Sequence, residues 1–232
     1  MAVRVTKETQ PRVVLKGANS GSVNSGVLSG SGDGVRVSMT FTATAEPLIV
    51  IPYGNVAEAQ LEEGSFATSY IPTSGSQQTR SADVASIPVS AFGYNQDAGT
   101  VVVEIGGHAG GSSGSQFVVS VDDGSTAQRM QVNRFNGNYI FDVFAGALQQ
   151  VSVLIGPSTD NSKVSFCYSN NDFAATEDGD TPVVDQSGSV PTTTTMSLGA
   201  DHLSTNHLNG HIKSIQYYPR RLTDAQLQEL TA

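Results

Sequence analysis

The stretch from Gln131 to Phe144 reads Gln-Val-Asn-Arg-Phe-Asn-Gly-Asn-Tyr-Ile-Phe-Asp-Val-Phe. Asn136-Gly137 stands between two runs that alternate apolar and polar residues, and this dipeptide is the strongest short signal for a type I′ hairpin turn. If these two residues form the loop, Phe135 lies opposite Asn138 and the other pairs follow outward. The stretch therefore predicts an antiparallel β-hairpin whose register is set by its turn.

This register divides the hairpin into two faces. On one face, apolar residues oppose one another: Met130 with Val143, and Val132 with Phe141. We expect this face in a core, because opposed apolar side chains stabilise a sheet when they are buried. The other face pairs Gln131 with Asp142 and Asn133 with Ile140. Because this face is mostly polar, we take Gln131, Asn133 and Asp142 as the candidate ligand-binding residues.

Short apolar or alternating runs recur along the chain of 232 residues. Charged residues make up 14% of the chain, against about 25% in an average domain. The run from Val101 to Ile105 is rich in β-branched residues, which favour strands. Further strands are predicted over residues 35–42, 48–52, 56–61, 117–121, 151–155, 163–168, 192–198 and 212–218. This pattern predicts an all-β protein built as an antiparallel β-sandwich.

The first third of the chain differs from the rest in composition. Residues 1–33 have few strand signals, and the Gly, Ser, Asn and Asp content of residues 17–34 is typical of a loop or linker. Residues 73–79 contain no large apolar side chain and follow a proline. We therefore predict a smaller N-terminal β unit over residues 1–75 and the sandwich over residues 76–232.

A single short helix is predicted at the C-terminal end of the sequence. Thr223 as N-cap and Gln226 three residues later form a capping box, in which each side chain pairs with the backbone N–H of the other residue. Leu222 before the cap and Leu227 after it suit a hydrophobic staple. A helix of about eight residues does not persist alone, so we expect this one to dock on the sandwich.

Composition argues against several classes of function. The formal net charge of −9 disfavours binding to a nucleic-acid backbone. No apolar run approaches the ~20 residues of a membrane-spanning helix, so we expect no membrane insertion. Cys167 is the single cysteine, which excludes an intrachain disulfide. We expect this cysteine to pack within a strand rather than to act as a nucleophile.

Two segments of the sequence resemble parts of a known family. Residues 60–73, Gln-Leu-Glu-Glu-Gly-Ser-Phe-Ala-Thr-Ser-Tyr-Ile-Pro-Thr, and then Thr79-Arg80-Ser81-Ala82-Asp83 resemble a junction in tail and fibre proteins of tailed bacteriophages. In those proteins a small galactose-binding-like sandwich leads into a concanavalin A-like (laminin-G-like) jelly roll. Residues 210–223, with Leu227, resemble the closing strand and terminal helix of that jelly roll. The resemblance implies a concanavalin A-like jelly roll here, preceded by an N-terminal unit shorter than in longer relatives.

The resemblance also implies a function. It points to a virion protein, such as a tail fibre or receptor-binding protein, that recognises polysaccharide on the host surface. Its partners would be other virion proteins, held through residues 1–75, and further copies of itself, with a trimer favoured. It would be assembled in the cytoplasm of the host bacterium, and the single thiol and the lack of a signal peptide pattern after Met1 agree with this. The alternatives are a capsid or tail decoration protein without glycan binding and a polysaccharide depolymerase.

Acidic residues gather between Asn170 and Thr181, and carboxylate oxygens of this kind bind calcium. Concanavalin A-like domains often hold calcium near a loop rim, so the resemblance makes Asp178 and Asp180 the candidate metal ligands. We expect no cofactor, and calcium is the alternative that these residues leave open. A second candidate set consists of histidines: His202, His207 and His211. Zinc sites use such ligands, but no predicted helix aligns the first two of these residues.

The sequence contains no convincing catalytic motif. Glycosidases of this fold take their carboxylates from one strand in a spacing such as Glu-x-Asp-x-Glu, and no such triplet occurs. A nucleophile elbow and a phosphate loop followed by a helix are also absent from the sequence. We therefore expect a protein that is not an enzyme. In the alternative of a polysaccharide depolymerase, the two catalytic carboxylates would come from separate strands, with Glu104 and Asp142 as candidates.

Overall fold

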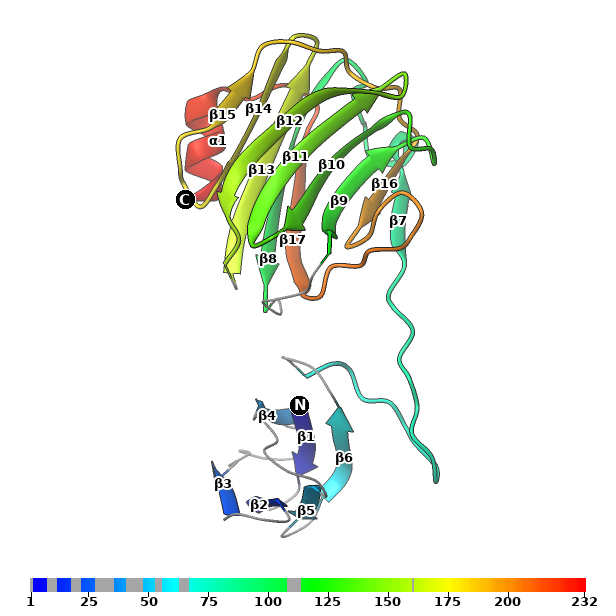
Figure 1. Ribbon diagram of the computed structural model, residues 1–232, viewed down its shortest axis with the longest axis vertical. Coiled ribbons are helices and arrows are strands. Elements are labelled where there is room, and N and C mark those ends of the chain that lie inside the picture. The colour runs from blue at the N-terminus through cyan, green and yellow to red at the C-terminus, as the bar shows by residue number, and fades with distance from the viewer. Residues whose placement is uncertain are drawn as a thin grey trace. The chain divides into compact units, whose positions relative to one another are not determined.

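The computed structural model describes residues 2–7, 12–17, 22–27, 36–40, 48–52, 56–62, 67–107, 114–159 and 161–232. The chain divides into two compact units, Met1–Arg80 and Ser81–Ala232 (Figure 1). Residues 67–84 contain neither helix nor strand, and the boundary predicted after residue 75 lies within them.

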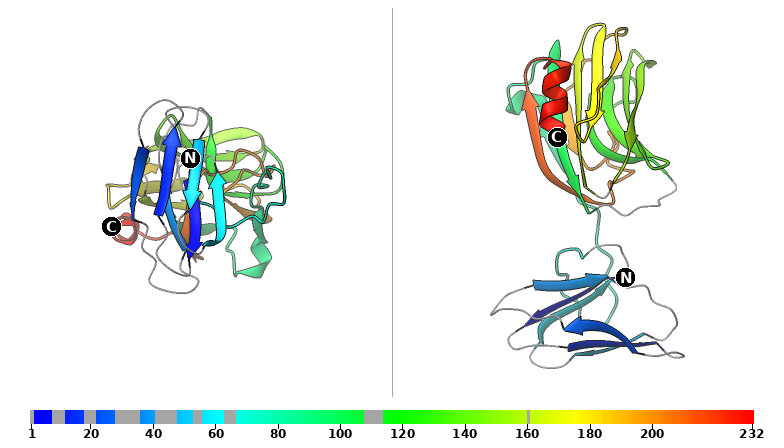
Figure 2. Two further views of the ribbon diagram at one scale, coloured as in Figure 1. Left: turned by 90° about the horizontal axis from the view of Figure 1, so that it is seen from below. Right: turned by 90° about the vertical axis from the view of Figure 1, so that its left-hand side faces the viewer.

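The first unit contains two three-stranded antiparallel sheets (Figure 2). One sheet has the strand order β4-β1-β6 and the other the order β3-β2-β5. The strands are β1 (Ala2–Lys7), β2 (Arg12–Gly17), β3 (Ser22–Val27), β4 (Arg36–Thr40), β5 (Leu48–Pro52) and β6 (Val56–Glu62). The strands predicted over residues 35–42, 48–52 and 56–61 correspond to β4, β5 and β6.

The expectation of few strands in residues 1–33 was wrong, because β1, β2 and β3 all lie there. β1 pairs on both sides, with Val3 opposite Met39 of β4 and opposite Leu61 of β6. β3, within the stretch predicted as a loop or linker, pairs with β2. Pairing with neighbouring strands decides strand formation in such segments, and a short window of composition does not report those neighbours.

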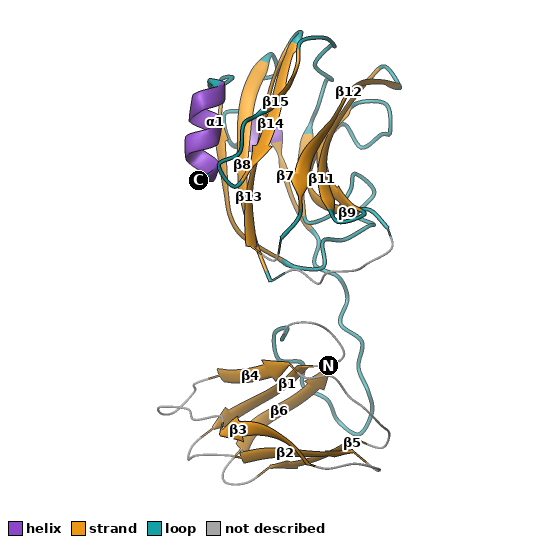
Figure 3. Ribbon diagram, turned by 60° about the vertical axis from the view of Figure 1, so that its left-hand side comes forward, coloured by secondary structure: helices purple, strands orange, loops and turns teal. Residues whose placement is uncertain are grey.

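The second unit consists of two antiparallel sheets that face one another, with the helix α1 (Asp224–Thr231) outside the five-stranded sheet (Figure 3). The six-stranded sheet has the order β12-β11-β10-β9-β16-β7, and the five-stranded sheet has the order β15-β14-β13-β8-β17. The strands are β7 (Ala85–Pro88), β8 (Ala98–Gly106), β9 (Gln116–Asp122), β10 (Arg129–Phe135), β11 (Asn138–Ala145), β12 (Leu148–Pro157), β13 (Asn161–Ser169), β14 (Asp172–Glu177), β15 (Val183–Asp185), β16 (Thr195–Leu198) and β17 (His211–Tyr218). The predicted class, an all-β antiparallel sandwich with a short C-terminal helix, is confirmed.

The core lies between these two sheets and is built by alternate residues of their strands. Val103 of β8 and Val132 of β10, which belong to different sheets, are part of one buried cluster. The rings of Phe141 in β11 and Phe166 in β13 stack across the interface with their centroids 4.7 Å apart. Aromatic pairs of this kind add to the stabilisation that apolar burial provides.

The hairpin of β10 and β11 has the predicted register. Asn136 and Gly137 have φ angles of 49° and 78°, the left-handed conformation that a type I′ turn requires at both central residues. Phe135 lies opposite Asn138, and the other predicted pairs follow in order: Asn133 with Ile140, Val132 with Phe141, Gln131 with Asp142, and Met130 with Val143. The prediction that the turn sets the register is confirmed.

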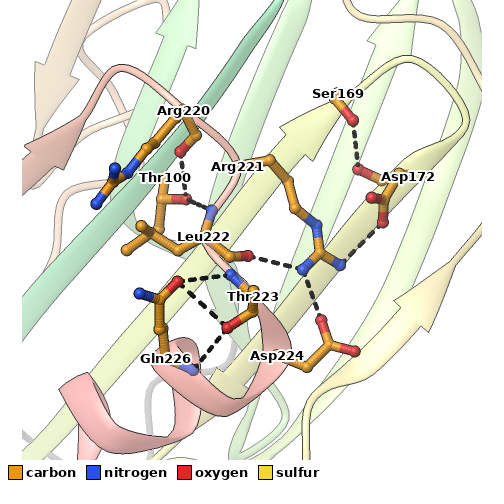
Figure 4. A network of polar contacts seen from close by, with 9 residues as sticks. All are labelled: Thr100, Ser169, Asp172, Arg220, Arg221, Leu222, Thr223, Asp224 and Gln226. Atoms are coloured by element: carbon orange, nitrogen blue, oxygen red, sulfur yellow. Dashed lines mark hydrogen bonds and ion pairs between the residues drawn. The ribbon is translucent and has the colours of Figure 1, made fainter.

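The capping box of α1 is also confirmed (Figure 4). The backbone N–H of Gln226 donates to the Thr223 hydroxyl over 3.3 Å, and the backbone N–H of Thr223 donates to the Gln226 side-chain oxygen over 3.0 Å. Leu222, just before the cap, donates its backbone N–H to the hydroxyl of Thr100 in β8 over 3.0 Å. The start of the helix is therefore tied to the five-stranded sheet.

Arg221 forms a second connection between the helix and the sheet (Figure 4). Its guanidinium is 2.8 Å from the carboxylate of Asp172 at the start of β14 and 2.7 Å from that of Asp224 in the first turn of α1. The same guanidinium donates to the carbonyl of Leu222. Because one planar cation binds β14, the first turn of the helix and the carbonyl just before the cap, it fixes where the helix starts.

We expect Thr223→Ala to lower the unfolding free energy by about 1 kcal/mol, the usual cost of losing an N-cap side chain. Thr223→Ser keeps the hydroxyl and should be close to the wild type. Urea unfolding of both variants and the wild type measures the difference. Equal losses in the two variants would contradict the capping role of this hydroxyl.

Candidate functional site

The outer face of the six-stranded sheet carries a row of polar residues that crosses all of its strands. The register places each member opposite the next: Ser86, Ser197, Ser120, Gln131, Asp142 and Ser152. We call these residues the polar row. The strands of this sheet bend, and the face turned away from the other sheet is the concave one (Figure 3). We call it the concave face.

Members of the polar row are buried although they point away from the core. Ser120 is 0% exposed, Gln131 is 5% exposed and Asp142 is 8% exposed. The centre of the polar row thus lies on the curved middle of the concave face, partly covered by flanking side chains; we call this part of the face the hollow. A few converging polar groups in a concave surface are the usual composition of a ligand site.

Gln131 and Asp142 keep hydrogen-bonding capacity that the described residues do not use. The Gln131 side-chain oxygen accepts from Nε of Arg129 over 3.0 Å, and Oδ1 of Asp142 accepts from the Gln149 amide over 3.1 Å. Within the described part of the chain, no hydrogen bond involves Nε2 of Gln131 or Oδ2 of Asp142. The hollow thus offers an amide donor next to a carboxylate acceptor.

Asn133 lies one step further along β10 on the same face, opposite Phe117 of β9 and Ile140 of β11. Only 7% of this residue is exposed, and its Oδ1 is buried without a hydrogen-bond partner among the described residues. An unpaired buried carbonyl costs free energy. Because this oxygen is buried, a ligand on the concave face would reach it only if the Asn133 side chain turned.

Arg129 and Phe144 form the other end of the hollow, and sequence reasoning did not select them. The guanidinium carbon of Arg129 lies 3.7 Å from the centroid of the Phe144 ring, which is a cation–π contact. Burial lowers the pKa of Arg129, while the charges of Asp142 and Asp122 act in the opposite direction. Phe144 follows Asp142 by two residues in β11, and side chains two residues apart in a strand point to the same face. This spacing could have placed Phe144 on the polar face from the sequence.

Several tyrosines of the sandwich, whose rings could have stacked on a sugar, belong to its interior. Tyr139 is fully buried, on the core side of β11 opposite Arg134. Tyr94 packs against both Tyr168 and Tyr217, with ring centroids 5.9 Å and 5.5 Å apart. These rings are part of the hydrophobic interior, whereas Phe144 contributes an aromatic ring to the concave face.

Asp178 and Asp180, predicted as metal ligands, are not part of a cluster of three or more metal-binding side chains among the described residues. Oδ1 of Asp178 accepts from the backbone N–H of Lys163 over 2.7 Å, which ties the turn after β14 to β13. Among the described residues, no group of three or more His, Cys, Asp or Glu side chains is placed to hold a metal ion. Calcium at these two residues stays a prediction, and the histidine set beside Asp201 has no further support.

Glu104 and Asp142 cannot act as a catalytic pair. Glu104 lies in β8 between the core residues Val103 and Ile105, so its side chain points to the outer side of the five-stranded sheet, where it pairs with Lys213 over 3.5 Å. Asp142 lies on the outer side of the other sheet. The two carboxylates are on opposite faces of the sandwich, whereas a glycosidase needs them about 5–10 Å apart across one bond.

A cavity of about 670 Å³ lies at the open side of the sandwich, between the edge strands β7 and β17. Its lining combines apolar residues such as Leu198, Leu208 and Ile212 with polar side chains: Asp83, His207, His211, Lys213 and Ser214. None of the three residues that the sequence predicts to bind a ligand is part of this lining. In the described part of the chain, no helix has the length and hydrophobicity needed to span a membrane.

Comparison with known proteins identifies the fold. No protein-family model matches the chain, and no curated protein matches it. The CBM40 module of the Ruminococcus gnavus IT-sialidase, bound to α2,3-sialyllactose, is similar with a TM-score of 0.52 and 16% identity, over 62% of this chain and 86% of that one. The same module bound to α2,6-sialyllactose has a TM-score of 0.52 and 15% identity, over 64% of this chain and 93% of that one.

The NanB sialidase of Streptococcus pneumoniae is also similar, with a TM-score of 0.50 and 13% identity, over 62% of this chain and 26% of that enzyme. At these identities the likeness concerns the fold. The chain therefore contains a lectin-like jelly-roll sandwich of the kind found in carbohydrate-binding modules.

Proposed function

We propose that residues 81–232 form a non-catalytic glycan-binding module whose site is the concave face of the six-stranded sheet. The observation that carries this proposal is the unused pair in the hollow, Nε2 of Gln131 and Oδ2 of Asp142. A sugar hydroxyl both donates and accepts, so two neighbouring hydroxyls can satisfy this donor and this acceptor together. The neighbouring Asn133 and Ser197 add polar groups within the same surface.

The fold supports this proposal, because the similar CBM40 modules were solved with sialyllactose bound. Separation of Glu104 from Asp142 removes the catalytic pair that a depolymerase would have used. We therefore propose binding without hydrolysis.

We further propose that this module is the adhesive part of a bacteriophage tail fibre or receptor-binding protein. The support is the sequence resemblance of residues 60–83 and 210–223 to such proteins. In this proposal residues 1–75 attach the module to other virion proteins, and copies of the chain associate, with a trimer favoured. A decoration protein of capsid or tail, the second candidate, would have the same fold and no affinity for glycan.

We expect Asp142→Ala to weaken binding to host-surface glycan at least tenfold, since a hydrogen bond to a charged group contributes about 1.5–3 kcal/mol. Gln131→Ala should weaken it less, by about threefold to tenfold, because its hydrogen bond to a hydroxyl is uncharged and contributes about 1 kcal/mol. Binding of the purified full chain to candidate host cells, before and after periodate oxidation of surface sugars, measures the effect. Glu229→Ala, on the exposed side of α1, is the matched control and should bind as the wild type does. Binding that survives both periodate and the two substitutions would contradict a glycan site on this face.

A further inference from the structure

The charges of the concave face are unequal, and this bears on which glycan fits it. The hollow contains two carboxylates, those of Asp122 and Asp142. Asp122 is 2% exposed and Asp142 is 8% exposed. One cation, Arg129, lies near them, and both carboxylates favour its charged form. The formal charge of this group of three side chains is −1.

Arg129 is already partly engaged within the protein, which uses two of its five N–H donors. Its Nε donates to the Gln131 side chain, and another nitrogen donates to the backbone carbonyl of Thr126. The Phe144 ring covers one face of the guanidinium. The charges of Asp122 and Asp142 already act on this guanidinium, so a ligand carboxylate would gain less from Arg129 than from an arginine without acidic neighbours.

The unit as a whole repels anions as well. Residues 81–232 contain fifteen acidic and six basic side chains, so this unit carries a formal charge of −9, whereas residues 1–80 contain six of each sign and are neutral. An approaching anion therefore meets a negative field before it reaches the hollow. Inside the hollow, the unpaired Oδ2 of Asp142 would lie directly against it.

We propose that the concave face selects neutral glycans, recognised through adjacent hydroxyl groups, and rejects those that carry a carboxylate, sulfate or phosphate at the bound residue. The inference rests on the proposed function and names the ligand class of the same site. Asp142 accepts from one hydroxyl, Gln131 donates to its neighbour, and the charge of Asp142 excludes acidic sugars. This selectivity differs from that of the CBM40 modules, which share the fold and were solved with sialyllactose.

The test uses the full chain and a panel of glycans in matched neutral and acidic forms, such as lactose with 3′-sialyllactose and oligogalactose with oligogalacturonate. We expect the neutral member of each bound pair to bind at least about tenfold more tightly. Raising the salt from about 50 to about 500 mM should leave neutral binding nearly unchanged and reduce the discrimination, because screening weakens the repulsion of the acidic member.

Asp142→Asn keeps the shape of the side chain and removes its charge. We expect this variant to bind neutral glycans less well and to discriminate less against the acidic members of each pair. Glu229→Gln makes the same charge change on the opposite side of the sandwich and should leave the ratio as in the wild type.

Tighter binding of the acidic members, weakened by salt, would overturn the selectivity and leave glycan binding in place. Binding of neither class, by protein shown to be folded, would overturn both the selectivity and the proposed function.

Discussion

From about pH 4.5 to about pH 8, the unfolding free energy of the wild-type protein is expected to fall by about 3 kcal/mol more than that of the Glu177→Gln variant. Glu177 is the last residue of β14, and only 2% of it is exposed. Burial, and secondarily the charges of Asp178 and Asp180, raise the pKa of its carboxyl from 4.5 to about 7.

The surroundings of Glu177 suit a neutral carboxylic acid. Gly156 in β12 leaves the space that the carboxyl occupies, because a Cβ at that position would overlap Oε1 of Glu177. Oε2 is buried and has no hydrogen-bond partner among the described residues. A carboxylate in such a place is disfavoured because it loses its hydration without gaining a partner.

The direction of the pH effect follows from these surroundings. The folded protein holds the proton of Glu177 up to about pH 7, whereas the unfolded chain releases it near pH 4.5. The stabilisation is complete below the lower value and is lost as the pH rises through the upper one, since the folded state binds more protons within this window. A glutamine at this position stays neutral throughout and has no such dependence.

Urea unfolding at several pH values provides the measurement. The fixed cost of burying the amide of Gln cancels when the unfolding free energies at two pH values are subtracted. Glu229→Gln, on the exposed side of α1, is the matched control and should keep the wild-type slope. Parallel curves for the wild type and Glu177→Gln would contradict a buried protonated carboxyl.

Leu227→Ala is expected to lower the unfolding free energy by about 3 kcal/mol, within the range of 2–5 kcal/mol for deletion of a buried leucine side chain. Leu227 is fully buried and belongs to a small cluster with Cys167, Ala174 and Leu222. This cluster lies between α1 and the five-stranded sheet, outside the main core. Because an eight-residue helix depends on docking, loss of this contact should loosen the whole helix.

The single cysteine provides a direct measure of that loosening. Cys167 is 0% exposed, and burial raises the pKa of its thiol to about 12, so it should react slowly with thiol reagents in the native wild type. In Leu227→Ala we expect faster modification of Cys167 under native conditions. The matched control is Glu229→Ala in the same helix, which should stay within about 0.5 kcal/mol of the wild type and keep the thiol protected.

A thiol that stays equally protected in Leu227→Ala, with no loss of stability, would show that the helix does not depend on this contact. Together with the cap variant Thr223→Ala, the experiment separates the local contribution of the helix start from that of tertiary docking.

Local features could be predicted from the sequence because their causes are local. The Asn136-Gly137 turn set the register of β10 and β11, since only residues that tolerate positive φ form this loop and the pairing then follows by count. Thr223 and Gln226 marked the start of α1 for a similar reason, because a capping box needs only residues three apart. The alternation of polar and apolar residues also separated Gln131, Asn133 and Asp142 from the core.

Other predictions were wrong or incomplete because they concerned features that form only when strands far apart in the sequence come together. Strands β1 and β2 of residues 1–33 were missed, and β4, β6 and β5, with which they pair, lie later in the chain; β3 was missed because its composition is that of a loop. Glu104 and Asp142 could be named as a catalytic pair only because the sequence does not show that they face away from each other. The acidic loop around Asp178 supplied carboxylates, but nothing local decides whether they converge.

The sequence by itself thus determined the all-β class, the hairpin register and the capped helix, because periodicity, turn conformation and caps act within a few residues. Only the tertiary structure decided that the polar row lines a hollow and that Arg129 stacks on Phe144 near the charges of Asp122 and Asp142. Only the structure, too, places Glu177 against Gly156. These properties depend on burial and on distances between strands, and both arise when the two sheets curve and pack together.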